Sequence, residues 1–142
     1  MEFDRLLLLR EEKELKQREL AEIIGVKQVN ISNWENMKEI IPLNRLNNYA
    51  NYFNVSLDYL TSLNNNKEYK PKCDIDKNCA KERLKEFRKN NNLTQEGLAN
   101  ILNTTHSTIS GYERGKTLIL TSFAYQICKN YNISMDWLCG RT

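Results

Sequence analysis

The sequence predicts an all-α protein built from two tandem modules, and three observations support this prediction. The chain has 142 residues but only 5 Gly and 2 Pro, which disfavours folds with many tight turns and favours long helices. Apolar residues recur at spacings of three and four, as in Leu20, Ile23 and Ile24. Shifting the chain by 78 residues aligns it with itself without a gap, giving 17 identities in the 58 pairs that begin with Arg5 and Arg83. We therefore expect one helical module to occur twice.

Five helices fit each module. In the first module we expect them over residues 3–13, 17–24, 28–35, 43–53 and 56–62, and in the second module 78 residues later. Gly25 and its counterpart Asn103 lie between the second and third helices, and both residue types tolerate a positive φ. Ser56 and Ser134 each precede an Asp by two residues, which is typical of a helix N-terminus. These serines mark the start of the last helix in each module.

The expected domain boundaries place the first module over residues 1–63, a linker over residues 64–77 and the second module over residues 78–142. The linker is polar, contains three consecutive Asn and Pro71, and has no apolar periodicity. At about 3.3 Å per residue it would extend to roughly 46 Å, and as a flexible coil it would average about 20 Å. Adjacent major grooves, about 34 Å apart, are within this reach.

Composition and charge exclude several classes of protein. With 40% apolar and 27% charged residues and a mean hydropathy of -0.66, the chain is expected to fold rather than to be disordered. Its longest apolar run, residues 6–9, is far shorter than the roughly 20 residues of a membrane span. No signal peptide is recognisable, and four cysteines without one are expected to be reduced thiols. We therefore expect a cytoplasmic protein with no membrane partner.

The charge is distributed unevenly between the modules. The formal net charge is +3, but residues 1–63 carry 8 Lys and Arg against 10 Asp and Glu, whereas residues 64–142 carry 13 against 8. A basic surface permits a polyanionic partner, although net charge alone does not require one. The two modules are thus expected to differ electrostatically.

Two helices joined by a short turn can present the second helix to the major groove of DNA, and both modules contain this arrangement. In the first module, Ile31 and Trp34 supply the inward face of the third helix, and in the second module Ile109 and Tyr112 do so. The outward positions of the first module hold Lys27, Gln28, Val29, Ser32 and Asn33. Those of the second module hold Thr105, His106, Ser107, Ser110 and Gly111. Amide, hydroxyl and ammonium groups such as these can read base edges.

Three sequence blocks in each module resemble the lambda-repressor-like, Cro/Xre-type helix-turn-helix proteins of phages and bacteria. In the first module these are LKQRELA at 15–21, ISNWENMK at 31–38 and FNVSLDYL at 53–60. In the second they are LTQEGLA at 93–99, ISGYERGK at 109–116 and YNISMDWL at 131–138. The resemblance implies two tandem five-helix domains that bind double-stranded DNA sequence-specifically, each with its third helix in the major groove.

The resemblance also implies roles for individual residues. Gln17 and Gln95 would bond to backbone phosphate and brace the third helix, and Lys38 and Lys116 would add phosphate contacts. Base contacts are implied for Gln28, Val29, Ser32 and Asn33 in one module and for His106, Ser107 and Ser110 in the other, with Lys27 and Thr105 beside them on the DNA-binding face. Ion pairs are implied between Arg10 and Glu35 and between Arg88 and Glu113.

Departures from the family pattern lead to three further expectations. Met37 replaces the glycine found at position 115, so we expect an altered loop after the third helix of the first module and a less secure contact through Lys38. Gly97 lies inside a helix, at a cost of roughly 1 kcal/mol relative to Ala. The first module also carries acidic residues that would repel DNA if they faced it, namely Glu11, Glu12, Glu14, Glu19 and Glu22.

The sequence therefore predicts a transcriptional regulator, of the repressor kind found in phages or mobile elements, rather than an enzyme. The chain has no phosphate-binding glycine loop and no paired-carboxylate constellation, and the single histidine, His106, has no nucleophile or supporting carboxylate in its motif. We expect no cofactor, no metal and no small-molecule effector. The two modules, each acting as one DNA-reading head, could form a pseudo-dimer within one chain, or the whole chain could form a homodimer.

Two other classes of function remain open at this point. In the first, an antirepressor or antitoxin-like protein, the acidic first module binds a protein partner and only the second module contacts DNA. In the second, Cys73 and Cys79 act as a thiol sensor, although their spacing is not the short one typical of zinc sites.

Overall fold

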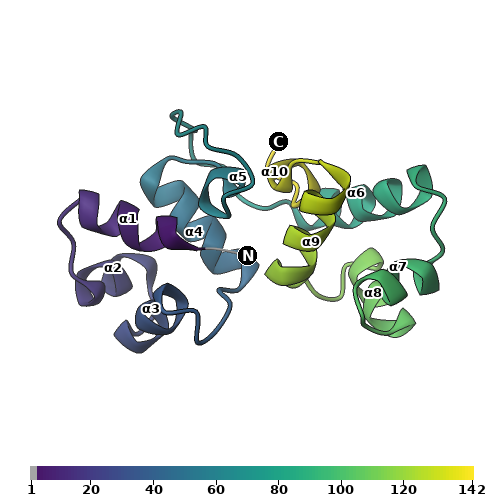
Figure 1. The fold of residues 1–142 in the computed structure, drawn as a ribbon, viewed down its shortest axis with the longest axis horizontal. Helices are drawn as coiled ribbons and strands as arrows, with labels where there is room; N and C mark the ends of the chain where they lie inside the picture. Colours follow the sequence, from purple (N-terminus) through teal and green to yellow (C-terminus); the bar gives the residue numbers. More distant parts are fainter. Residues whose placement is uncertain (1–2) are drawn as a thin grey trace. The chain divides into compact units, whose positions relative to one another are not determined.

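The computed structural model describes residues 3–142, and within that range it contains ten helices and no strand. The chain divides into two compact units, Met1–Cys73 and Asp74–Thr142. Unit 1 contains α1 (Asp4–Glu12), α2 (Gln17–Ile24), α3 (Gln28–Glu35), α4 (Leu43–Phe53) and α5 (Leu57–Leu60). Unit 2 contains α6 (Lys77–Asn90), α7 (Gln95–Ile101), α8 (His106–Glu113), α9 (Thr121–Tyr131) and α10 (Met135–Leu138) (Figure 1). The all-α prediction with five helices per module is confirmed.

The ends of the helices follow from local chemistry. Gly25 and Asn103 both have positive φ values, 85° and 56°, so the same left-handed turn joins the second and third helices of each unit. The hydroxyl of Ser56 accepts a hydrogen bond from the backbone N–H of Tyr59, and Ser134 caps the last helix of unit 2 in the same way. Both capping predictions and the repeated turn are confirmed.

The start of α6 differs from the expected boundary. The helix begins at Lys77, four residues before the expected start at residue 81, because the carboxylate of Asp76 accepts hydrogen bonds from the N–H groups of Asn78 and Cys79. The backbone N–H of Asp76 in turn donates to the carbonyl of Gly140 at 3.2 Å. An Asp that satisfies two otherwise unpaired N–H groups is a strong helix start, and it extends α6 into the segment expected as linker.

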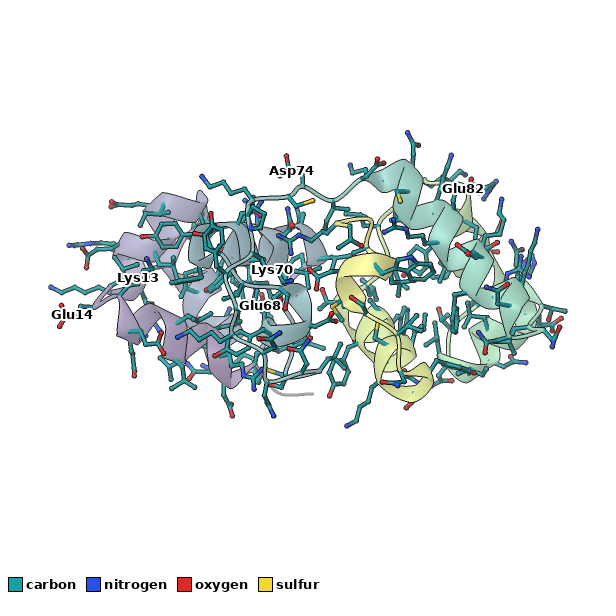
Figure 2. All side chains as sticks on the ribbon, turned by 90° about the horizontal axis from the view of Figure 1, so that it is seen from above. Lys13, Glu14, Glu68, Lys70, Asp74 and Glu82 are labelled. Atoms are coloured by element: carbon teal, nitrogen blue, oxygen red, sulfur yellow. The ribbon has the colours of Figure 1, made fainter. Side chains whose placement is uncertain are left out.

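Most of the segment expected as a linker lies against unit 1. The backbone N–H of Lys70 donates to the carbonyl of Asn54 at 2.8 Å, and the Asn54 side chain donates to the carbonyl of Lys70 at 3.2 Å. Further along, the N–H of Cys73 donates to the side chain of Asn51 at 2.9 Å. Glu68 and Lys70 of this segment form an ion pair (Figure 2). While these contacts hold, the fully extended length of residues 64–77 overstates the reach of the connection.

Each unit has its own apolar core, built from the inward faces of its helices. The α2 and α3 helices pack against each other in unit 1, as do α7 and α8 in unit 2 (Figure 1). The fully buried side chains of unit 1 include Leu6, Leu20, Ile31, Ile41, Leu46, Tyr49, Leu57 and Leu60. Those of unit 2 include Leu98, Ile109, Ala124, Ile127 and Met135. Close packing of these buried side chains holds each helix pair rigidly.

The described residues contain no candidate membrane span and no candidate metal site. No helix in residues 3–142 is long and apolar enough to cross a membrane. In the same part of the chain, no group of three or more His, Cys, Asp or Glu side chains is placed to hold a metal ion.

Candidate nucleic-acid interface

The α3 helix of unit 1 separates its side chains into a buried face and an accessible face. Ile31 and Trp34 are 0% and 4% exposed and anchor the helix in the core. The expected reading residues lie on the other side: Lys27, Gln28 and Val29 are exposed, and Ser32 and Asn33 are half-buried. The backbone N–H of Lys27 donates to the side chain of Asn30 at 3.0 Å, which fixes the start of the helix. The accessible face therefore carries an ammonium, two amides and a hydroxyl around one valine.

The α8 helix of unit 2 has the same division with different side chains. Ile109 and Tyr112 are buried, and Thr105, His106 and Ser107 are exposed, with Ser110 half-buried. The Thr105 hydroxyl caps the helix by accepting from the N–H of Thr108 at 3.2 Å. A Cβ added at Gly111, the position of Asn33 in α3, would have no atom within 4 Å. Unit 2 thus presents smaller groups, with open space where unit 1 has an amide.

A buried ion pair links the first and third helices in each unit, as expected from the family pattern. The Nε and Nη2 atoms of Arg10 lie 2.7 and 2.9 Å from the two carboxylate oxygens of Glu35. Arg88 and Glu113 form the same two contacts at 2.7 and 3.0 Å. The Glu35 and Glu113 side chains are only 3% and 2% exposed. The hydrogen bonds that Arg10 donates to Glu35 raise the pKa of the guanidinium, so Arg10 stays charged at physiological pH.

The two glutamines expected to contact phosphate are held by these same ion pairs. The Nε2 atom of Gln17 lies 3.0 Å from Glu35 Oε1, and Nε2 of Gln95 lies 3.2 Å from Glu113 Oε1. Both side chains are half-buried. A glutamine amide has two N–H donors, so one donor remains for a phosphate oxygen after the first has bonded to the glutamate. Each unit therefore positions its glutamine through a network that runs from the first helix to the end of the third.

The turn after the third helix is the same in both units, which overturns the expected alteration at Met37. Met37 has φ 58°, in the left-handed region that Gly115 occupies with φ 75°. The N–H of Lys38 donates to the carbonyl of Asn33 at 2.9 Å, and the corresponding bond in unit 2 is 3.0 Å long. The surrounding turn thus forces a non-glycine residue into a strained conformation. Lys38 and Lys116 are consequently held by equivalent backbones, and both are exposed.

Unit 1 has more basic residues next to its helix-turn-helix than unit 2, although the net charge of the first module is lower than that of the second. In unit 1, exposed cations stand at Lys16, Arg18, Lys27 and Lys38. The aligned positions of unit 2 hold Thr94, Glu96, Thr105 and Lys116, and Arg114 adds one further exposed cation. Lys16, Arg18 and Arg114 were not among the residues predicted to contact DNA, although Lys16 and Arg18 directly flank Gln17. Unit 1 is therefore the more basic of the two at these positions, despite its net negative charge.

The starts of α2 and α7 also differ in how their N–H groups are satisfied. In unit 1, the Glu19 carboxylate accepts from the N–H of Lys16 at 2.9 Å. In unit 2, the Thr94 hydroxyl accepts from the N–H of Gly97 at 2.9 Å, and a Cβ at Gly97 would lie 3.2 Å from that hydroxyl. Each unit uses one half of the reciprocal capping box. Gly97 therefore lies in the first turn of α7, where the close Thr94 hydroxyl leaves little room for a side chain.

Comparison with known proteins agrees with the internal repeat. A family model described as helix-turn-helix matches residues 6–60 and matches again at residues 84–138. No curated protein and no solved structure matches the chain. The first match covers α1 to α5 except for the first two residues of α1, and the second covers the second half of α6 and all of α7 to α10.

Proposed function

The chain belongs to the Cro/C1-type helix-turn-helix family, a family of DNA-binding transcription regulators, and we propose that it is a sequence-specific regulator of the repressor kind found in phages or mobile elements. In this proposal each unit places its third helix, α3 or α8, in the major groove of double-stranded DNA. The chain then carries two reading heads that are covalently joined, which raises the effective concentration of the second head once the first has bound.

The observation that carries the proposal is the network that ends at Gln17 and, in unit 2, at Gln95. In both units a buried carboxylate holds the glutamine amide at the start of the second helix, next to the accessible face of the third. An amide fixed in this way can bond to backbone phosphate without first losing side-chain freedom. The glutamate uses one of the two N–H donors of each amide, and the second is available to a phosphate oxygen.

The two heads are proposed to read different base sequences. Gln28 and Asn33 in α3 carry amides that suit bidentate contacts to adenine, whereas the corresponding residues of α8 are His106 and Gly111. The operator of one chain is therefore two unlike half-sites rather than a palindrome.

The test is a selection of bound sequences from a randomised duplex pool at near-physiological salt, using the full chain and single variants. We expect Gln28→Ala and His106→Ala to change base preference at two separate positions of the selected sequence. Gln95→Ala should weaken binding to all sequences to a similar extent, because its contact is with phosphate. Identical changes in preference from Gln28→Ala and His106→Ala would refute the two-head proposal.

One observation favours a second candidate, in which unit 1 binds a protein partner and only unit 2 contacts DNA. Met37 and Ile40 are 42% and 44% exposed, and both lie in the loop between α3 and α4. Exposed apolar side chains grouped in a loop are common at protein–protein interfaces. Under this alternative, the selected DNA would contain one half-site, and Gln28→Ala would leave the selected sequence unchanged.

A further inference from the structure

A row of lysines on α6 has no counterpart in unit 1. Lys77, Lys81, Lys85 and Lys89 occur at every fourth residue, so successive members lie about 6 Å apart along the helix axis. The positions of unit 1 that align with the last three are Phe3, Leu7 and Glu11. Since both units have the same fold, these lysines are not required for it.

The first two lysines of the row lie beside the DNA-facing turn after α8. A Cβ placed on Gly115 would lie only 3.2 Å from Cδ of Lys81, so the aliphatic part of Lys81 crosses this turn. Lys77, Lys81 and Lys116 border the same cavity of about 60 Å³, which lies between α6 and the turn. Lys85 and Lys89 are not among the residues that line this cavity. We refer to Lys77, Lys81 and Lys116 as the lysine cluster.

The charges of the lysine cluster are not neutralised by neighbouring carboxylates. Within residues 3–142, none of its three ammonium groups forms an ion pair. Glu82 and Glu86, the acidic residues of α6, are both exposed, and Glu82 projects outward from the helix (Figure 2). Lys77 also occupies the first position of α6, where the helix dipole disfavours a positive charge. Neither ion pairing nor helix stability therefore accounts for this arrangement.

Core packing does not account for Lys81 either. The aligned residue in unit 1, Phe3, is 2% exposed and so contributes its ring to the core. In unit 2, Lys81 borders the cavity of about 60 Å³, whose other walls include Leu84, Tyr112 and Ile119. An apolar side chain would suit these neighbours better than a lysine does.

We propose that the lysine cluster is a second, sequence-independent binding surface of unit 2, which contacts backbone phosphates of the duplex that α8 reads. This inference rests on the proposed function. The cluster is continuous with that function's surface through Lys116, and it compensates for the cations that unit 2 lacks at Thr94, Glu96 and Thr105. Unit 2 thereby anchors the chain on the DNA backbone, whereas unit 1 obtains its phosphate contacts from residues adjoining its helix-turn-helix.

The test compares two double variants of the full chain that remove the same charge from the same helix. Lys77→Gln/Lys81→Met removes two members of the cluster and keeps an aliphatic chain over the cavity, and Lys85→Gln/Lys89→Gln is the matched control. Binding to the selected duplex and to a scrambled duplex is measured by fluorescence anisotropy between 50 and 200 mM KCl. Each lost phosphate contact makes the slope of log K against log[salt] shallower by about 0.9.

We expect the cluster variant to have a slope shallower by about 1.8 on both duplexes, with an unfolding midpoint no lower than that of the wild type. The control should change the slope by well under half that amount. Equal changes in the two double variants would show that net charge alone is responsible, and an unchanged slope in the cluster variant would show that no contact was lost; either result overturns the inference. A loss confined to the selected duplex would also overturn it, because it would indicate base reading. If the wild-type chain binds no duplex, the proposed function is refuted. If the wild type binds and the salt slope of the cluster variant equals that of the wild type, only this inference is refuted.

Discussion

Replacing Glu35 with leucine tests how firmly the buried network holds Gln17, the glutamine proposed to contact phosphate. The Glu35 carboxylate is almost fully buried and accepts three hydrogen bonds, two from Arg10 and one from Gln17. Removing one partner of a buried ion pair costs about 3–5 kcal/mol. Because Arg10 keeps its 2.7 Å hydrogen bond to the carbonyl of Leu15, we expect the lower end of this range, about 3 kcal/mol.

The assay is urea unfolding of the full chain in a Trp137→Phe background, in which Trp34, adjacent to Glu35, is the remaining tryptophan. The double variant Arg10→Met/Glu35→Leu removes both charges and should lie within about 1 kcal/mol of the background, because no unpaired charge stays buried. A cost below about 1 kcal/mol for Glu35→Leu, or a double variant as unstable as the single one, would refute this reasoning.

The exposed pair between Glu12 and Lys67 provides the control for burial. The Glu12 side chain is 54% exposed and that of Lys67 43%, so Glu12→Leu should cost no more than about 1 kcal/mol. DNA binding provides the functional readout for the buried network. Once Glu35 is lost, Gln17 has no fixed orientation, and affinity for all duplexes should fall together.

Three further predictions concern stability and pH. Gly140→Ala should destabilise unit 2 by at least about 2 kcal/mol in urea unfolding, since Gly140 has φ 76° and its Cβ would lie 2.5 Å from the carbonyl oxygen of Asp76. Lys16→Thr should stabilise unit 1 by about 1 kcal/mol, measured as a shift in unfolding midpoint, because it completes the capping box with Glu19. Burial raises the pKa of Tyr49, whose buried hydroxyl has no hydrogen-bond partner among the described residues, so stability should fall as pH rises above about 10. Tyr49→Phe should keep the stability of unit 1 at neutral pH and weaken this alkaline loss, as followed by unfolding at pH 7 to 11.

Each of these three predictions has a control or a result that opposes it. Gly115 has a φ similar to that of Gly140, but a Cβ there meets only the flexible Lys81 side chain, so Gly115→Ala should lower stability clearly less than Gly140→Ala. Equal losses of stability would refute the argument from backbone collision. An unchanged unfolding midpoint for Lys16→Thr would mean that the threonine hydroxyl does not cap α2. An identical alkaline profile for Tyr49→Phe would show that another group governs the pH dependence.

Much of the fold could be predicted because its determinants are local in sequence. Apolar spacing located the five helices of the first module and the 78-residue repeat located those of the second, and residue types that favour caps and left-handed turns located Ser56, Ser134, Gly25 and Asn103. The α6 start was misplaced because Asp76 was assigned to a polar linker, although an Asp before a helical segment is itself a start signal. This error came from weighing the composition of the whole segment above the capping chemistry of one residue.

The features that sequence reasoning missed depend on tertiary context. A methionine has no intrinsic preference for the left-handed conformation, so the unchanged turn at Met37 follows from the hydrogen bonds of the turn rather than from the residue. The placing of Lys81 against Gly115 needs the packing of α6 beside α8. Net charge per module did not locate the cations beside the helix-turn-helix, because it sums charged residues regardless of where they lie in the fold.

The most direct test of the central claim exchanges the reading residues of one head for those of the other. The variant Gln28→His/Val29→Ser/Asn33→Gly gives α3 the side chains that α8 carries at the aligned positions, including the shared serine at 32 and 110. Duplexes selected by this variant are sequenced beside those selected by the wild type. We expect the two unlike half-sites of the wild type to become two copies of the half-site read by α8. Selection of the wild-type sequence by the exchanged variant would contradict the claim that α3 and α8 each read DNA.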